Sequence, residues 1–191
     1  FDVVGLGVIG GYWQYRKMLG ISKAIQASKH RPSWYVLGGH GPSPCPEYFL
    51  KKSGADFVVR GEGERTVIEL LGALEQGYSL ASVSGISFKD VNGQYTHTPD
   101  RHLLDVDEIP WPEYTLFPIE YYRLASSPGA DKTDFVMPVA SARGCTFRCN
   151  FCYRMDKGFR PRNPEGIAVE IEYLQNRYGI TYIDFSDELL M

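Results

Sequence analysis

The chain has 191 residues, of which 43% are hydrophobic and 23% charged, and its formal net charge at pH 7 is −3. These proportions are ordinary for a globular protein, and the slight acidic excess argues against a general binder of nucleic acid or membrane surfaces. No apolar run approaches the roughly 20 residues that a membrane-spanning helix needs. Phe1 opens directly on a strand-like run without a signal peptide, and the last residues stop in mid-pattern. We therefore expect a fragment of a longer protein that lacks both ends.

Residues 1–80 alternate short apolar runs, which are predicted strands, with segments of helical spacing. In chain order, these strands and helices are expected at residues 2–7, 12–29, 34–37, 47–52 and 55–59, and a last helix follows G-E-G-E (61–64) and runs to about Gln76. Strands that alternate with helices favour a parallel sheet covered on both faces. We therefore predict a doubly wound, Rossmann-like α/β domain over residues 1–80.

Glycines lie at the ends of the predicted strands of this domain, at positions 5, 7, 38, 39, 61 and 63. Glycine lets a ligand approach the backbone closely, and doubly wound domains bind ligands outside the carboxyl ends of their strands. The pattern predicts a ligand site at these turns. The alternative is that the glycines serve only the tight turns themselves.

Residues 81–134 are predicted to form a hairpin and a proline-rich linker. Asn92-Gly93 is a strong two-residue hairpin signal between two strand-like runs within 86–98. Beyond residue 98 the periodicity disappears and prolines recur. Because disordered segments are poor in aromatic residues, the aromatic residues of the linker are expected to anchor it against one of the domains, namely Trp111, Tyr114 and Phe117.

Residues 135–191 have the pattern strand, helix, strand, which we interpret as the start of a truncated (β/α) barrel. The first strand, over 135–141, runs directly into R-G-C-T-F-R-C-N-F-C-Y, so this loop leaves the carboxyl end of a strand, where barrel enzymes place their chemistry. Asn163 and Pro164 predict the start of the helix, and 181–185 is the second strand. The apolar face of the helix is predicted to comprise Ile167, Ile171, Leu174 and Tyr178.

Three of the four cysteines, Cys145, Cys149 and Cys152, have the spacing C-x3-C-x2-C. Thiolates this close together suit an iron–sulfur cluster or zinc. A closed zinc site or a ferredoxin cluster uses four ligands, and Cys45, between two prolines, is expected to be a partly buried small residue. Three thiolates leave one iron open to substrate, so the spacing favours a catalytic centre. The alternative is a set of buried or disulfide-bonded cysteines, which is rare on a polar loop, and free thiolates suit the reducing cytoplasm.

This motif, with Phe151 before its last cysteine, resembles the signature of radical SAM enzymes. The resemblance implies that Cys145, Cys149 and Cys152 hold a 4Fe–4S cluster whose fourth iron chelates S-adenosylmethionine (SAM). It also implies that Phe151 packs near the adenine of SAM.

The same resemblance assigns roles to charged residues near the loop. It implies that the acidic pair after the last predicted strand, Asp187 and Glu188, meets the methionine ammonium of SAM. The alternative for this pair is a helix N-terminal cap. Positive charge beside the anionic cluster would come from Lys157, Arg160 and Arg162, unless these residues form a solvated basic loop.

The first domain is similar to the cobalamin-binding domain found before the radical SAM domain of many such enzymes. The similarity lies in D-V-V-G-L-G, V-L-G-G-H-G-P-S-P and A-D-F-V-V-R-G-E-G-E. It implies that cobalamin contacts the turns after the strands, at Gly38, Gly39, Gly61, Glu62 and Gly63. His40 is expected to be a loop residue and not a cobalt ligand. From the resemblance we expect that the family's first strand, which would precede Phe1, is missing from the chain.

Together the resemblances imply an enzyme of the class B methylase or oxidative cyclase type. It would cleave SAM reductively, with cobalamin, for methyl transfer, rearrangement or cyclisation of a small-molecule substrate, and the fragment alone would be inactive. Flavodoxin or ferredoxin would supply the electron. Two alternatives stay open. One is a radical SAM enzyme whose first domain is a scaffold without cobalamin, and the other is a non-catalytic iron–sulfur carrier, which would need a fourth cysteine ligand.

Overall fold

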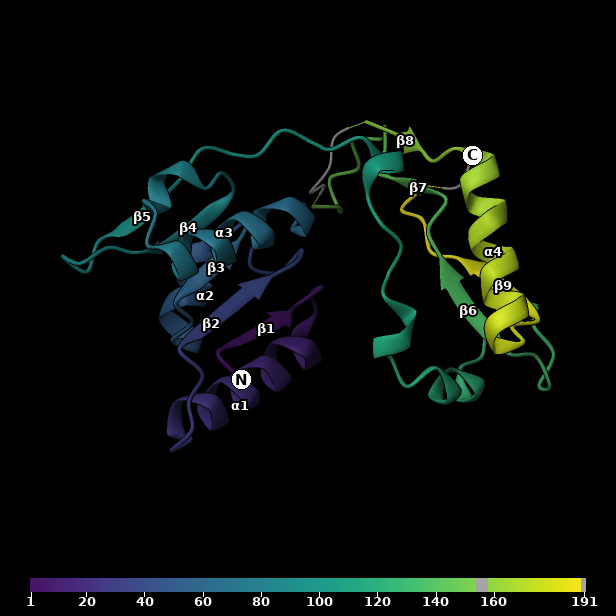
Figure 1. Ribbon diagram of the computed structural model, residues 1–191, viewed down its shortest axis with the longest axis horizontal. Coiled ribbons are helices and arrows are strands. Elements are labelled where there is room, and N and C mark those ends of the chain that lie inside the picture. The colour runs from purple at the N-terminus through teal and green to yellow at the C-terminus, as the bar shows by residue number, and fades with distance from the viewer. Residues whose placement is uncertain (154–157, 190–191) are drawn as a thin grey trace. The chain divides into compact units, whose positions relative to one another are not determined.

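A computed structural model describes residues 1–153 and 158–189 of the chain (Figure 1). The chain divides into two compact units, residues 1–103 and 104–191. Each unit is an α/β structure with its own hydrophobic core. No helix in the described parts of the chain is long and apolar enough to cross a membrane.

The first unit is built on one five-stranded sheet in which the strands follow each other in chain order. The first three strands are parallel and the last two antiparallel. Leu37 in the centre of the sheet lies beside Leu6 on one side and Val58 on the other. The strands are β1 (Val3–Gly7), β2 (Trp34–Gly38), β3 (Phe57–Val59), β4 (Ile86–Lys89) and β5 (Tyr95–His97).

Helices cover both faces of this sheet, as predicted for a doubly wound domain. Tyr35 and Leu37 of β2 share a core with α1 and α2, whereas Val36 packs with α3 on the opposite face, because neighbouring strand residues point to opposite sides. The predicted Rossmann-like fold class is therefore confirmed. Its helices are α1 (Tyr12–Ala27), α2 (Pro46–Ser53), α3 (Glu64–Gln76) and the short 3₁₀ turn η1 (Leu80–Ser82).

The hairpin belongs to the first sheet, whereas the sequence placed it in a segment between domains. Strand β4 pairs antiparallel with β3, with Ile86 opposite Val59. Ile86 and Ser87 are fully buried. The open edge of β3 needs a hydrogen-bonding partner, and the hairpin supplies it.

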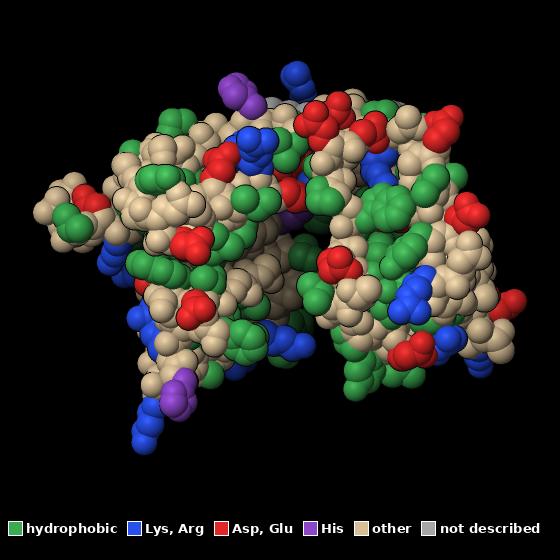
Figure 2. Space-filling view, in the orientation of Figure 1, with side chains coloured by type: hydrophobic (Ala, Val, Ile, Leu, Met, Phe, Trp, Pro, Cys, Tyr) green, Lys and Arg blue, Asp and Glu red, His purple; other side chains and the backbone are tan. Residues whose placement is uncertain are grey.

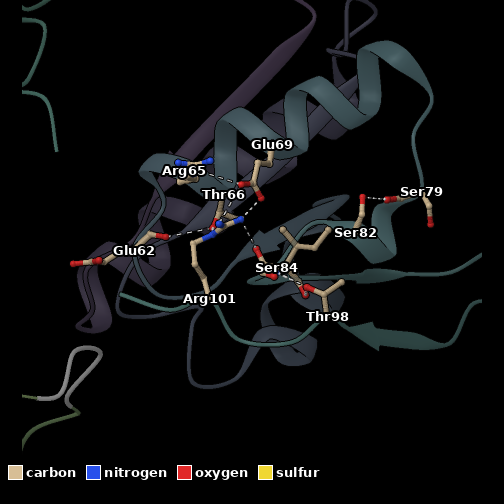
Figure 3. Close-up of polar contacts among 10 residues, drawn as sticks. Glu62, Arg65, Thr66, Glu69, Ser79, Ser82, Ser84, Thr98 and Arg101 are labelled. Atoms are coloured by element: carbon tan, nitrogen blue, oxygen red, sulfur yellow. Dashed lines mark hydrogen bonds and ion pairs between the residues drawn. The ribbon is translucent and has the colours of Figure 1, made fainter. Parts of the chain in front are cut away.

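The chain leaves the first sheet through a cluster of charged residues around Arg101 (Figure 3). The Arg101 guanidinium donates to Thr66 Oγ1 at 2.7 Å and forms an ion pair with Glu69, so it joins the exit segment to the first turns of α3. The hydrogen bond from Arg101 lowers the pKa of the Glu69 carboxyl. The contacts around Arg101 therefore hold α3 where it follows the glycine turn at 61–63.

The second unit contains the predicted strand–helix–strand arrangement. Strands β6 (Val136–Val139) and β9 (Tyr182–Phe185) are parallel neighbours, connected through α4 (Pro164–Tyr178). The Asn163 side chain caps α4 by accepting from the Glu165 N–H, and Gly179 ends the helix in the left-handed conformation. The remaining elements are the strands β7 (Ala142–Arg143) and β8 (Arg160–Pro161) and the 3₁₀ turns η2 (Val106–Glu108), η3 (Tyr114–Leu116) and η4 (Ile119–Leu124).

The proline-rich segment packs into the core of the second unit. Tyr114 and Ile119 are buried with Leu174 of α4, and the Trp111 ring lies 6.0 Å from the ring of Tyr173. Phe117 is 48% exposed. Of the three predicted aromatic anchors, two therefore contact α4 or its core and the third lies largely at the surface.

The inner face of α4 carries a buried charge that the apolar pattern did not predict. Glu170 is only 2% exposed. Its Oε1 accepts a hydrogen bond of 2.6 Å from the Tyr114 hydroxyl, and its Oε2 lies 2.7 Å from the Arg162 guanidinium. A buried carboxylate needs such partners, so the core of the second unit includes a polar network.

Candidate cofactor-binding sites

The predicted glycine turns lie together at the carboxyl end of the first sheet. The Val8 N–H donates to the Gly38 carbonyl and the Gly41 N–H donates to the Val8 carbonyl, each at 2.9 Å. The Ser43 hydroxyl donates to the Gly39 carbonyl at 2.8 Å and accepts from the Gly61 N–H at 3.1 Å. Ser43, which the sequence did not single out, thus joins the turn after β2 to the turn after β3.

Crowding within the fold explains the glycine at one of these turn positions but not at two others. Gly39 has φ +96°, and a Cβ there would lie 2.7 Å from the Val8 carbonyl oxygen. The fold itself therefore requires glycine at this position. At Gly38 and Gly63 a Cβ would make only ordinary contacts, the nearest at 3.6 Å, so these two glycines are not explained by crowding. Glu62, between the turn glycines, is buried at 6% exposure.

An apolar cavity of about 310 Å³ opens beside these turns. The Tyr15 and Tyr48 hydroxyls are 2.7 Å apart at its wall, and this hydrogen bond raises the pKa of Tyr15. The loop after β1 supplies much of the lining, although the sequence analysis did not assign it a cofactor role. Its signal was the run V-I-G-G-Y directly after the first strand. The lining residues are Val8, Gly10, Gly11, Tyr12, Tyr15, Gly41, Tyr48 and Phe49.

Two further predicted positions lie near this cavity. His40 is half-buried in the turn between Gly39 and Gly41. Cys45 is exposed and not partly buried as predicted, because it lies at the surface where α2 begins. Its thiol lies 3.7 Å from the Gly41 carbonyl, and partial desolvation there raises the pKa of the thiol. A raised pKa favours the protonated thiol over the thiolate that binds metals.

In the second unit, the cysteine loop (residues 144–153) begins where a two-residue ribbon ends. Strands β7 and β8 pair antiparallel, and Gly144 turns the chain with φ +76°. Cys145 is half-buried, whereas Cys149 and Cys152 are exposed, and all three are free thiols. Phe151 projects from the loop at 95% exposure. The predicted ligands are thus carried by one loop at the carboxyl end of β6.

The structure does not gather the three thiols into a finished metal site. Within residues 1–153 and 158–189, no three His, Cys, Asp or Glu side chains lie close enough together to hold a metal ion. Binding sites of this kind are rarely complete before the metal draws its ligands together. The donor set, three free thiols on one short loop, suits a soft metal centre.

The charged residues around the loop make contacts that the sequence did not predict. Asp187 accepts hydrogen bonds from Ser141 and Ala142, whereas Glu188 is exposed. Arg162 was expected either beside the cluster or in a solvated loop, but its side chain is 15% exposed and pairs with Glu170. Arg160 donates to the Leu104 carbonyl at 2.8 Å. Lys157 lies outside the described residues.

On the face drawn in Figure 2, acidic, basic and hydrophobic side chains are interspersed over both units. This distribution agrees with the net charge of −3.

The fold and these sites define a class of protein. A doubly wound domain has glycine turns and an apolar cavity at its strand ends, and a strand–helix–strand unit carries three free cysteines after its first strand. Comparison with known proteins identifies the first of these domains: residues 1–71 match the B12 binding domain family.

Relatives extend this match across most of the chain. Over 80% of its length, the chain is 38% identical to an uncharacterized methyltransferase of Pyrococcus horikoshii. Over the same share it is 34% identical to the anaerobic magnesium-protoporphyrin IX monomethyl ester cyclase of Synechocystis sp.. The matched regions cover 33% and 30% of those two proteins, so the chain spans about a third of the curated relatives that it matches.

A solved structure has the same fold. The cobalamin-dependent S-adenosylmethionine radical enzyme OxsB, with aqua-cobalamin bound, matches 98% of this chain and 25% of its own length. The TM-score is 0.74 and the sequence identity 26%. These comparisons confirm the resemblances found in the sequence: the chain is a relative of the cobalamin-dependent radical SAM enzymes.

Proposed function

We propose that the full-length protein is a cobalamin-dependent radical SAM enzyme acting on a small-molecule substrate. The observation that carries the proposal is the succession of two sites in one chain. Residues 1–71 match a B12 binding domain, and a three-thiol loop follows at the carboxyl end of β6. The relatives named as a methyltransferase and a cyclase support methyl transfer or cyclisation as the reaction.

In this proposal Cys145, Cys149 and Cys152 hold a 4Fe–4S cluster and leave one iron open to SAM. When bound, the cluster supplies the electron that splits the sulfonium of SAM. The chain would position the reactants, because Phe151 would pack its exposed ring near the adenine and the acidic pair after β9, through at least one of its two carboxylates, would meet the methionine ammonium. Oriented binding of this kind can account for much of a rate enhancement.

The first unit has surfaces that suit a corrin. The turns at Gly38–Gly39 and Gly61–Gly63 place glycine backbone at the ends of the strands, where a ligand could approach it closely. The adjacent cavity is apolar and lined in part by tyrosines. Since neither Gly38 nor Gly63 is required by crowding within the chain, we assign them to contact with the ligand. His40 stays a loop residue in this proposal and not a cobalt ligand.

The proposal also includes the partner and the compartment. Reductive chemistry at the cluster needs a one-electron donor such as flavodoxin or ferredoxin. The three free thiols suit a reducing compartment, so we place the protein in the cytoplasm.

The cluster assignment is tested by anaerobic reconstitution of the full-length protein, followed by iron and sulfide analysis. We expect about one 4Fe–4S cluster per chain. Ala at Cys145, Cys149 or Cys152 should abolish it, and Cys45→Ala is the matched control that should not. Equal loss of iron in the Cys45→Ala protein would reveal a fourth ligand and favour the electron-carrier alternative.

Cobalamin binding is tested by the corrin absorbance that the protein retains after desalting. Gly63→Val should lose cobalamin and keep its cluster, because the added side chain lies at the turn after β3. Gly72→Val, in the same unit but within α3, is the control and should retain both. Wild-type protein without retained corrin would support the scaffold alternative.

A further inference from the structure

The segment that enters the cysteine loop is held by side chains from two distant parts of the second unit. This segment, residues 140–142, connects the end of β6 to Gly144 and Cys145. Its N–H groups are bound by Asp187 and its carbonyl groups by Arg162.

Asp187 binds the N–H groups of the segment. Its Oδ1 accepts from the Ser141 N–H at 2.8 Å and from the Ala142 N–H at 3.0 Å, and its Oδ2 accepts from the Ser141 hydroxyl. Asp187 lies two residues beyond Phe185, which is paired with Val139 at the end of β6. The parallel pairing of β6 and β9 therefore delivers the carboxylate to this place.

Arg162 binds the carbonyl groups. Its guanidinium donates to the Ala140 carbonyl at 2.6 Å, and its backbone N–H donates to the Ser141 carbonyl at 2.9 Å. The same guanidinium is paired with the buried carboxylate of Glu170 in α4. The arginine is thus fixed to the core of the unit while it holds the segment.

These hydrogen bonds restrict the backbone conformation of residues 140–142, immediately before the first cysteine. Hydrogen bonds to an ionised carboxylate are about twice as strong as neutral ones, and Asp187 accepts three of them. Cys145 follows Ala142 after only two residues and is the half-buried cysteine of the three. Cys149 and Cys152 lie further along the loop and are exposed.

We propose that Asp187 is a positioning residue that sets the direction in which Cys145 enters the metal site. The inference rests on the proposed function, since it takes the loop to hold a cluster. It divides the roles of the acidic pair. Asp187 serves the loop through Ser141 and Ala142, and the exposed Glu188 serves the ammonium of SAM.

A first experiment uses the full-length protein without metal and measures the rate at which iodoacetamide alkylates each cysteine, by mass spectrometry of peptides. Asp187→Ala should raise the rate at Cys145 roughly fivefold or more, the factor that corresponds to a net hydrogen bond of about 1 kcal/mol. The rates at Cys149 and Cys152 should stay unchanged. Asp187→Asn should have a smaller effect, because its amide oxygen can still accept from the two N–H groups.

Two variants make this measurement specific. Ser141→Ala removes only one donor to Asp187 and should raise the Cys145 rate less than Asp187→Ala does. Glu172→Ala removes an exposed carboxylate of α4 and should change nothing. Circular dichroism checks that each variant is folded. Wild-type protection of Cys145 in folded Asp187→Ala would overturn the proposal.

A second experiment measures iron release from the reconstituted cluster to a chelator. Loss of a group that orients a metal ligand typically lowers metal affinity by about 10–100-fold. Asp187→Ala should therefore release iron at least about tenfold faster than the wild-type protein. If the Asp187→Ala variant instead releases iron at the wild-type rate while the electron paramagnetic resonance signal of its cluster no longer responds to SAM, the result would show that Asp187 binds SAM. If the wild-type protein takes up no cluster, the proposed function fails, and the alkylation rates still decide the role of Asp187.

Discussion

Replacing Glu170 by alanine should destabilise the second unit more than any change on the outer face of α4. Glu170 is 2% exposed and its partner Arg162 has a side chain only 15% exposed. Removing one member of a buried ion pair costs about 3–5 kcal/mol, because the remaining charge stays buried without its partner. The Tyr114 hydroxyl would also lose its acceptor. A unit of this size has roughly 4–13 kcal/mol of stability in total, so the loss is a large part of it.

The assay is urea unfolding of the 191-residue chain, followed by the fluorescence of Trp111. The other two tryptophans, Trp13 and Trp34, belong to the first unit and are replaced by phenylalanine. The Trp111 ring lies 6.0 Å from Tyr173 of α4, so its signal reports the packing of that helix. With a slope of about 1–3 kcal/mol per molar urea, Glu170→Ala should lower the urea midpoint by about 1–5 M.

Glu172→Ala, two residues along the same helix, is the matched control. Its side chain is exposed, and surface substitutions usually change stability by less than about 0.5 kcal/mol. A loss below about 1 kcal/mol for Glu170→Ala would refute the reasoning, because it would mean that the ion pair is hydrated or that Arg162 finds another partner without cost.

Three further outcomes are expected. Burial, followed by the hydrogen bond to the neighbouring carboxylate, raises the pKa of Tyr114, while an unfolded tyrosine ionises near pH ~10. The contribution of Tyr114 to the stability of the second unit should thus be fully present below that pH and be lost as the pH rises above it. The urea midpoint should therefore decline less with rising pH in Tyr114→Phe than in the wild-type chain. Limited proteolysis should cut first within 99–105, between the two compact units, and early cuts inside the first sheet would contradict the domain division. Gly39→Val should lower the thermal midpoint of the first unit strongly, since its Cβ would meet a carbonyl oxygen. Gly63→Val alters the N-cap of α3, but its Cβ would make only ordinary contacts, so it should lower the midpoint much less. Equal shifts would show that the close approach at position 39 is relaxed at little cost.

The sequence by itself determined the features that depend on neighbouring residues. Strand–helix alternation predicted the doubly wound domain, because periods of two and 3.6 residues are local signals. Asn163 and Gly179 marked the ends of α4 through capping and a left-handed turn, and the structure has both. The spacing of three cysteines within eight residues predicted a soft-metal loop without knowledge of any other part of the chain.

Only the tertiary structure decided which polar groups distant in sequence meet. Asp187 lies 46 residues from Ser141, and Tyr114 lies 56 residues from Glu170. An acidic residue in a helix or after a strand is usually solvated, so nothing local marks Glu170 as buried or Asp187 as a partner of Ser141. The parallel pairing of β6 with β9 brings Asp187 to the cysteine loop, and the packing of the proline-rich segment on α4 brings Tyr114 to Glu170. Their roles follow from this pairing and packing, because a carboxylate removed from water must find donors wherever the fold places them.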